Sequence, residues 1–236
     1  MPLDPAAKRF LSMMAAAASE GRSPATLDER RQAFAKMMRL ARADVAAVTG
    51  VDSAMPGPGG DLPYRLYAPA DDVTEFLPGF VFFHGGGMVG GSIESHDLVA
   101  AALAQVTGCR LVSVGYRLAP EHKYPAAVED AIAATRWVSE QASSLGIDAA
   151  RLVVGGDSAG ATLAAVICQE ALRSGGPAIA AQCLICRCSI SKRPLPRAKN
   201  SPKTICSTGP RWRRTSRCIC RKGWSVAIPE FRRCAR

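Results

Sequence analysis

The chain has 236 residues, an apolar content of 48% and a formal net charge of +10. This length allows one α/β domain or two small ones, and the apolar content is enough for a buried core. No apolar run approaches the roughly 20 residues of a membrane-spanning helix, so we expect no membrane span.

The charge is unevenly distributed along the chain. Residues 1–184 contain 15 Lys and Arg against 19 Asp and Glu, a net of −4, whereas residues 185–236 contain 15 Lys and Arg against one acid, a net of +14. Cysteine divides in the same way, with three residues in the first part and six in the second. We therefore expect the folded body to end near Ile185. Its three cysteines lie in apolar contexts, which is typical of reduced thiols in a cytoplasmic protein.

Two helices are predicted near the N-terminus. Lys8-Arg9 followed by the apolar run 10–18 is interpreted as an amphipathic helix that starts near Asp4 and Pro5. The alternative is a short signal peptide, although Ser12 interrupts the run. Residues 24–42 carry apolar side chains at helical spacing and predict a second helix.

Strands and helices alternate through the rest of the body. Residues 50–60 are rich in Gly and Pro and predict a loop. Strands are predicted at 62–67, 80–83, 110–114, 152–154 and 182–185, with helices at 96–106, 126–145 and 159–172. This alternation is typical of βαβ units around a parallel sheet. Active sites in such sheets lie at the carboxyl ends of the strands.

Gly156-Asp157-Ser158-Ala159-Gly160 matches the pattern G-x-S-x-G. The pattern predicts a sharp turn from a strand into a helix, with the Ser158 hydroxyl exposed at the edge of the sheet. The flanking glycines are needed because a Cβ at either position would clash with neighbouring backbone. The alternative is a glycine-rich turn whose serine is incidental.

His84-Gly85-Gly86-Gly87 directly follows the apolar strand 80–83. Successive glycines allow backbone N–H groups to turn toward a ligand. A phosphate loop is one interpretation, but the Gly-Lys-Ser/Thr ending of such loops is missing. The other is an oxyanion loop that would lie on the same edge of the sheet as Ser158.

These two motifs, with Tyr116 to Glu121 between them, occur in an order and spacing that resembles the hormone-sensitive-lipase-like (GDXG) α/β-hydrolases. The resemblance covers residues 1–185. It implies an eight-stranded, mostly parallel sheet flanked by helices, with residues 1–45 as N-terminal cap helices and 46–185 as a partial core. The sheet would then be incomplete on its C-terminal side.

The resemblance also implies a role for each motif residue. Ser158 would be the nucleophile, and the backbone N–H groups of Gly86, Gly87 and Ala159 would hold the oxyanion. His84 would brace the glycine loop, and the other supporting positions would be Gly85, Gly156, Asp157 and Gly160. Met88 replaces the aromatic residue usual in the family, and Ala161 replaces a usual glycine.

The family mechanism needs a histidine base and a carboxylate that follow the serine in the chain. All three histidines of this sequence (His84, His96 and His122) precede Ser158, and the only later acids are Glu170 and Glu230. We therefore expect a carboxylic ester hydrolase without cofactor or metal, whose activity is impaired in this chain. The alternatives are a catalytically dead ester-binding module and a basic nucleic-acid-binding protein.

The basic segment 186–236 has three interpretations. Its Cys-x-Cys pairs suggest a metal site, although the spacing differs from Cys-x₂-Cys. Its arginines suggest a nucleic-acid arm. The third is a shifted reading frame, because re-reading the codons with one restored base gives an acidic, patterned sequence similar to the family. We favour the shifted frame, and expect this segment to be disordered and to bind no nucleic acid.

Overall fold

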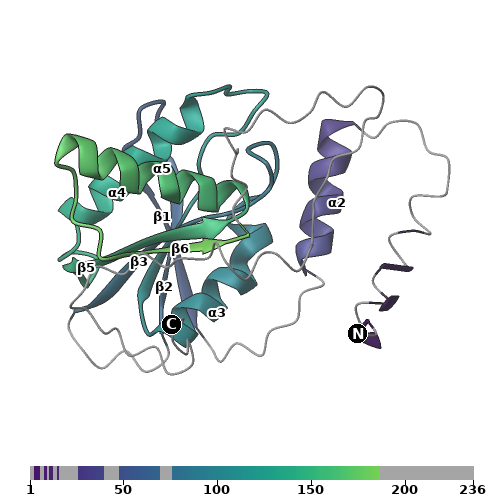
Figure 1. Ribbon diagram of the computed structural model, residues 1–236, viewed down its shortest axis with the longest axis horizontal. Helices are drawn as coiled ribbons and strands as arrows, with labels where there is room; N and C mark the ends of the chain where they lie inside the picture. Colours follow the sequence, from purple (N-terminus) through teal and green to yellow (C-terminus); the bar gives the residue numbers. More distant parts are fainter. Residues whose placement is uncertain are drawn as a thin grey trace, which may run out of the picture.

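The computed structural model describes residues 26–39, 48–69 and 76–186, together with residues 3–5, 8–9, 11–12 and 15. The described part is an α/β fold built on a six-stranded sheet (Figure 1). Most of the expected helix at 10–18 and almost all of the basic segment lie outside the described residues. The expectations for that segment are therefore not tested by the structure.

The sheet has the strand order β1-β2-β4-β3-β5-β6. β3, β4, β5 and β6 run parallel, while β1 and β2 form an antiparallel extension at one side. The prediction of a mostly parallel sheet flanked by helices is confirmed. The strands are β1 Thr49–Met55, β2 Leu62–Ala68, β3 Leu77–Phe83, β4 Arg110–Val114, β5 Ile147–Asp157 and β6 Ala181–Ile185.

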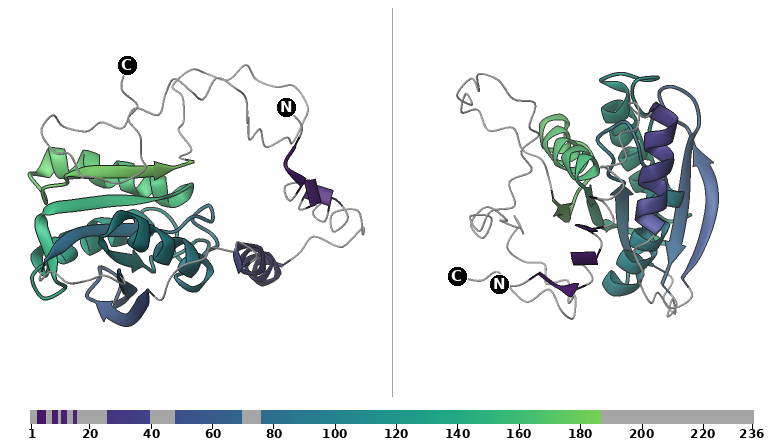
Figure 2. Two further views of the ribbon diagram at one scale, coloured as in Figure 1. Left: turned by 90° about the horizontal axis from the view of Figure 1, so that it is seen from below. Right: turned by 90° about the vertical axis from the view of Figure 1, so that its right-hand side faces the viewer.

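Helices cover both faces of the sheet (Figures 1 and 2). On one face, α4 (Ala126–Glu140) and α5 (Ala159–Ser174) pack against Val81, Val112 and Val154. On the other face, α3 (Asp97–Thr107) packs against Phe80, Phe82 and Leu111, and a short 3₁₀ helix, η1 (Glu94–His96), precedes it. Because both faces are covered, the central strands are apolar on both sides, as expected for buried parallel strands.

The prediction of a loop over residues 50–60 is wrong for its first half. β1 occupies Thr49–Met55 and pairs with β2 along its whole length. The pairing is stabilised by tertiary contacts, because the Asp52 carboxylate accepts hydrogen bonds from Arg65 opposite it and the Met55 side chain is buried. Only the Gly- and Pro-rich residues after Met55 form the expected turn.

α2 (Leu27–Arg39) is the helix expected within residues 24–42. It lies apart from the sheet, as Figures 1 and 2 show from different sides, and it contacts η1. None of its side chains is fully buried. Its apolar side chains Phe34, Met37 and Met38 are half-buried.

Candidate active site

Ser158 lies between the end of β5 and the start of α5. Its backbone has φ 49° and ψ −107°, a left-handed conformation that non-glycine residues rarely adopt. Its N–H donates to the Ile185 carbonyl at the end of β6 (2.8 Å), and its side chain makes no capping hydrogen bond to α5. The strained turn thus leaves the hydroxyl of a half-buried serine unused by the helix that follows it.

Two glycines allow this turn to press against the neighbouring strand. A Cβ at Gly156 or at Gly160 would collide with the carbonyl oxygen of Phe83, the last residue of β3. At Gly160 the same Cβ would also meet the His84 carbonyl oxygen at 2.8 Å. The close packing between β3, β5 and α5 therefore requires glycine at both positions, which is the physical reason given for them from the sequence.

The glycine loop follows β3 and lies directly against the serine turn. Gly86 and Gly87 have positive φ angles of 121° and 68°, and the N–H of Gly90 donates to the Gly86 carbonyl (2.9 Å). The Gly85 N–H donates to the Asp157 carboxylate (2.8 Å), and a Cβ at Gly85 would collide with that carboxylate. The loop and the serine turn are thus joined through Asp157, the residue before Ser158.

His84 is buried at the base of this loop. Its Nδ1 lies 2.8 Å from the Gly85 carbonyl oxygen, which can only accept, so Nδ1 carries the proton and donates. The ring stacks on Tyr116 at a centroid distance of 4.4 Å, and the Tyr116 hydroxyl donates to the His84 carbonyl (2.7 Å). Burial lowers the pKa of His84 to about 4, so the imidazole is neutral at neutral pH.

His96 forms a second buried group that the sequence analysis placed only at the start of a helix. Its Nδ1 lies 2.8 Å from the Ser95 hydroxyl, and its Nε2 lies 3.5 Å from the Asp157 carboxylate. Its ring is 5.4 Å from that of His84. The only signal in the sequence was its position shortly after the glycines. His96 Nε2 is buried and makes no hydrogen bond within the described residues, and it faces the carboxylate that accepts from the Gly85 N–H.

The sequence did not predict the salt bridge between Arg31 of α2 and Glu121. Arg31 binds both carboxylate oxygens of Glu121, at 2.8 and 2.7 Å. It also donates to the carbonyls of Val89 (2.7 Å) and Ala119 (3.0 Å). The hydrogen bond from Arg31 lowers the pKa of Glu121 to about 2. Glu121 belongs to a motif noted in the sequence, but no local pattern indicated a partner 90 residues away.

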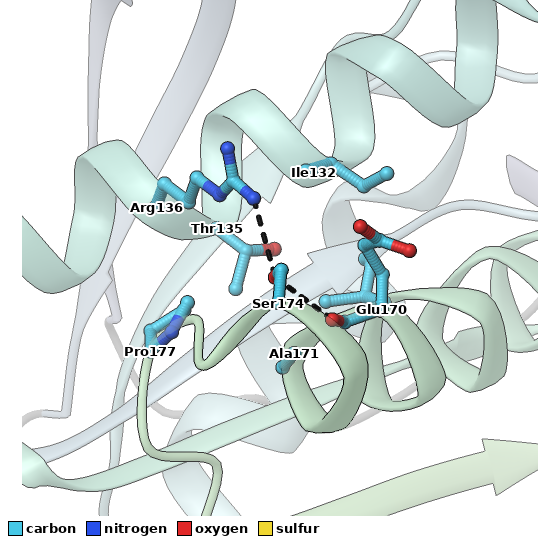
Figure 3. Close-up of a pocket in the computed structure, with 8 residues that line it drawn as sticks. Ile132, Thr135, Arg136, Glu170, Ala171, Ser174 and Pro177 are labelled. Carbon is cyan, nitrogen blue, oxygen red and sulfur yellow. Dashed lines mark hydrogen bonds between the residues drawn. The ribbon is translucent and has the colours of Figure 1, made fainter.

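Of the other acids and histidines noted in the sequence, His122 and Glu170 lie in the described part of the chain, and neither is near the serine turn. His122 is exposed. Glu170 lies on α5 and lines a shallow hollow between α4 and α5, where Arg136 Nη2 donates to Ser174 Oγ (3.5 Å; Figure 3). None of the residues of the serine turn or the glycine loop lines that hollow. Glu230 lies outside the described residues.

The described residues contain neither a metal-binding cluster nor a membrane-spanning helix. Within the ranges given above, no three His, Cys, Asp or Glu side chains are grouped so that they could hold a metal ion. None of the described helices is long and apolar enough to cross a membrane.

Parallel strands covered by helices on both faces, with a strained serine turn beside a glycine loop at their carboxyl ends, define an α/β protein of hydrolase type. A family model described as "alpha/beta hydrolase fold" matches residues 80–228. The chain belongs to this family, and its relatives place it among the hormone-sensitive-lipase-like members.

Three similar proteins illustrate this relationship. Esterase LipI of Mycobacterium tuberculosis is 50% identical over 136 residues, which cover 57% of this chain and 42% of LipI. An ethyl acetate hydrolase of Pseudomonas putida is 39% identical over 177 residues, covering 72% and 56%. The structure of ester-hydrolase EH1AB1 from the metagenome of Lake Arreo, in complex with a derivative of bipyridine phosphonate, superposes with a TM-score of 0.76 at 39% identity, covering 81% and 62%. The chain thus spans about half the length of these curated relatives.

Proposed function

We propose that the chain carries the nucleophile half of a carboxylic ester hydrolase, with Ser158 as the attacking group. The observation that carries this proposal is the strained turn at Ser158, which leaves its hydroxyl unused by α5 and is joined to the glycine loop through the neighbouring Asp157. In such a reaction the serine oxygen attacks the ester carbonyl, the alcohol leaves, and water hydrolyses the acyl-enzyme.

The oxyanion of the intermediate would be held by backbone N–H groups of Gly86, Gly87 and Ala159. The positive φ angles of the two glycines support this assignment, because they turn successive amides away from a regular strand. Ala159 is the first residue of α5, where N–H groups have no partner within the helix. His84 acts as a brace in this scheme, since its proton-bearing Nδ1 is already used within the loop.

We propose small esters with short acyl groups as the substrate class. The support is the name of the ethyl acetate hydrolase that is 39% identical to this chain. Met88, which has a φ of 63° and packs against the core, would be one of the side chains facing the acyl group. We further propose that the protein acts in the cytoplasm, in line with the cysteine thiols Cys109 and Cys168 of the body.

The positions of the histidines determine how the proposal is tested. All three histidines of the given sequence precede Ser158, and His84 and His96 are both buried and in contact with other groups. We therefore expect slow hydrolysis of p-nitrophenyl acetate, since an oxyanion site and binding alone still give some catalysis when part of a triad is absent. Imidazole supplied in solution should raise the rate by replacing the absent base.

The matched control for this assay is Ser158→Ala. Imidazole also cleaves the substrate directly, so the relevant quantity is the rate of the wild-type chain minus that of the variant. A phosphonate ester should label the wild-type chain at Ser158 and leave the variant unlabelled. Equal rates and equal labelling in the two proteins would contradict the proposal.

A catalytically dead ester-binding module is the second candidate, favoured by the same absence of a histidine after Ser158. A boronic acid bound tightly at Ser158, with no turnover even in imidazole, would select this candidate. The proposed shift of reading frame is tested separately, by sequencing the gene across the codon for Ile185. We expect one additional base there, after which the downstream codons become acidic and patterned.

A further inference from the structure

Arg31 makes the main polar contacts between α2 and the body. No side chain of α2 is fully buried, and apolar residues such as Phe34 are half-buried. Arg31 makes four hydrogen bonds to the body, two to the Glu121 carboxylate and one each to the carbonyls of Val89 and Ala119. The planar guanidinium suits this role because its donors are held in a fixed fork.

Two of these contacts involve the glycine loop: one is made to Val89 within it, and one to Ala119, which is hydrogen-bonded to it. The Val89 carbonyl belongs to the turn in which the N–H groups of Val89 and Gly90 both donate to Gly86 (3.2 and 2.9 Å). The Ala119 N–H donates to the Met88 carbonyl (2.8 Å), while the Ala119 carbonyl accepts from Arg31. Arg31 therefore links Val89, in the second half of the loop, to Ala119 in the segment that follows β4.

α2 also contacts His96, which lies close to the first half of the loop. Phe34, on the same helix, packs against the His96 ring at a centroid distance of 5.9 Å. His96 Nε2 lies 3.5 Å from the Asp157 carboxylate, which accepts the Gly85 N–H. Through Arg31 the helix thus contacts Val89 in the loop, and through Phe34 it contacts His96. The helix lies about 50 to 60 positions before the loop in the chain.

We propose that Arg31 is a positioning residue that fixes the conformation of the glycine loop, so that docking of α2 and ordering of the loop are coupled. The guanidinium touches no reacting atom and acts through the Val89 carbonyl. The importance of this coupling for ester chemistry rests on the proposed function of the loop. The coupling between α2 and the loop is independent of that function, and it can be measured without substrate.

Hydrogen exchange of the full-length chain tests the coupling. In Arg31→Ala, we expect amide exchange to rise about tenfold both in α2 and in residues 85–91, with little change in α5. Arg30→Ala is the matched control, since it removes the same charge from an exposed position on the same helix. It should change neither segment. Arg31→Lys keeps the charge without the fork and should rescue the loop only partly.

The outcomes separate a positioning role from a merely structural one. Faster exchange in α2 with an unchanged loop would overturn the proposal, as would no change in either segment. Faster exchange throughout the molecule would show only a loss of overall stability, and would also overturn it. Exchange confined to α2 and residues 85–91 supports it.

Phosphonate labelling of Ser158 in the presence of imidazole gives a second measurement. We expect Arg31→Ala to lower the limiting rate constant of labelling about tenfold, with little change in the probe concentration for half-maximal rate, because the loop would act on the transition state rather than on binding. An unchanged rate constant would show that Arg31 does not position the loop for reaction. If the wild-type chain is not labelled at all, the proposed function fails, while the exchange experiment still decides whether α2 and the loop are coupled.

Discussion

The serine turn and the glycine loop lie side by side, yet they are held in different ways. The turn is fixed by backbone packing, since Gly156 and Gly160 bring it against the last carbonyl of β3. The loop is fixed by side chains from other parts of the chain, above all Arg31, Tyr116 and Asp157. The comparison shows that one half of the site depends on the backbone packing of a single motif, while the other half depends on side chains from several separate segments.

This difference predicts which substitutions are tolerated. Backbone packing fails when a single methyl group is added, because backbone atoms cannot move aside. Contacts made by side chains can be lost one at a time, and each loss affects the loop more than the fold. Substitutions at Gly160, His84 and Ser158 test this difference.

Gly160→Ala should have the largest effect, because its Cβ would collide with the carbonyl of Phe83 and crowd that of His84. We expect a loss of unfolding free energy of about 3 kcal/mol or more, measured by urea denaturation. Gly175→Ala is the control: it also adds a methyl group, but into open space at a φ of 64°. It should cost only about 1 kcal/mol. Equal losses would show that packing at the turn is not tight.

His84 should make the stability depend on pH, because burial lowers its pKa from 6.5 to about 4. Between these values the unfolded chain binds a proton that the folded chain does not, so stability is complete above pH 6.5 and falls as the pH decreases toward 4. The loss should be about 3 kcal/mol. His84→Asn should flatten the profile between pH 5 and 6.5, whereas His122→Asn, at an exposed position, should not. A profile unchanged in His84→Asn would contradict this.

Ser158→Gly should change the free energy of unfolding least, and it should stabilise the protein rather than destabilise it. The φ of 49° at Ser158 is strained for serine but not for glycine. Strain of this kind costs on the order of 1–3 kcal/mol, part of which is offset by the greater freedom of glycine in the unfolded chain. We expect a net gain of about 1 kcal/mol in thermal unfolding, with no gain in Ser158→Ala. A glycine variant less stable than the alanine variant would argue against strain at this turn.

Much of the fold could be predicted from the sequence. The apolar runs of β3 to β6 and the helical segments between them indicated parallel strands, because buried strands and amphipathic helices are encoded by neighbouring residues. β1 could not be predicted, since its residues resemble a loop until Arg65 and the rest of β2 pair with them. Strand propensity depends on the partner strand, which a local pattern does not contain.

The positions of the serine motif and the glycine loop could be read from the sequence, because each is a short run of adjacent residues. All three histidines of the given sequence precede Ser158. The packing of the motif glycines on Phe83 comes only from the tertiary fold. The same is true of the approach of His96 to Asp157 and of the contacts that Arg31 makes with Glu121 and Val89. Hydrogen bonds and ion pairs act only at contact distance, and the folding of the chain alone brings residues 31, 89 and 121 to that distance.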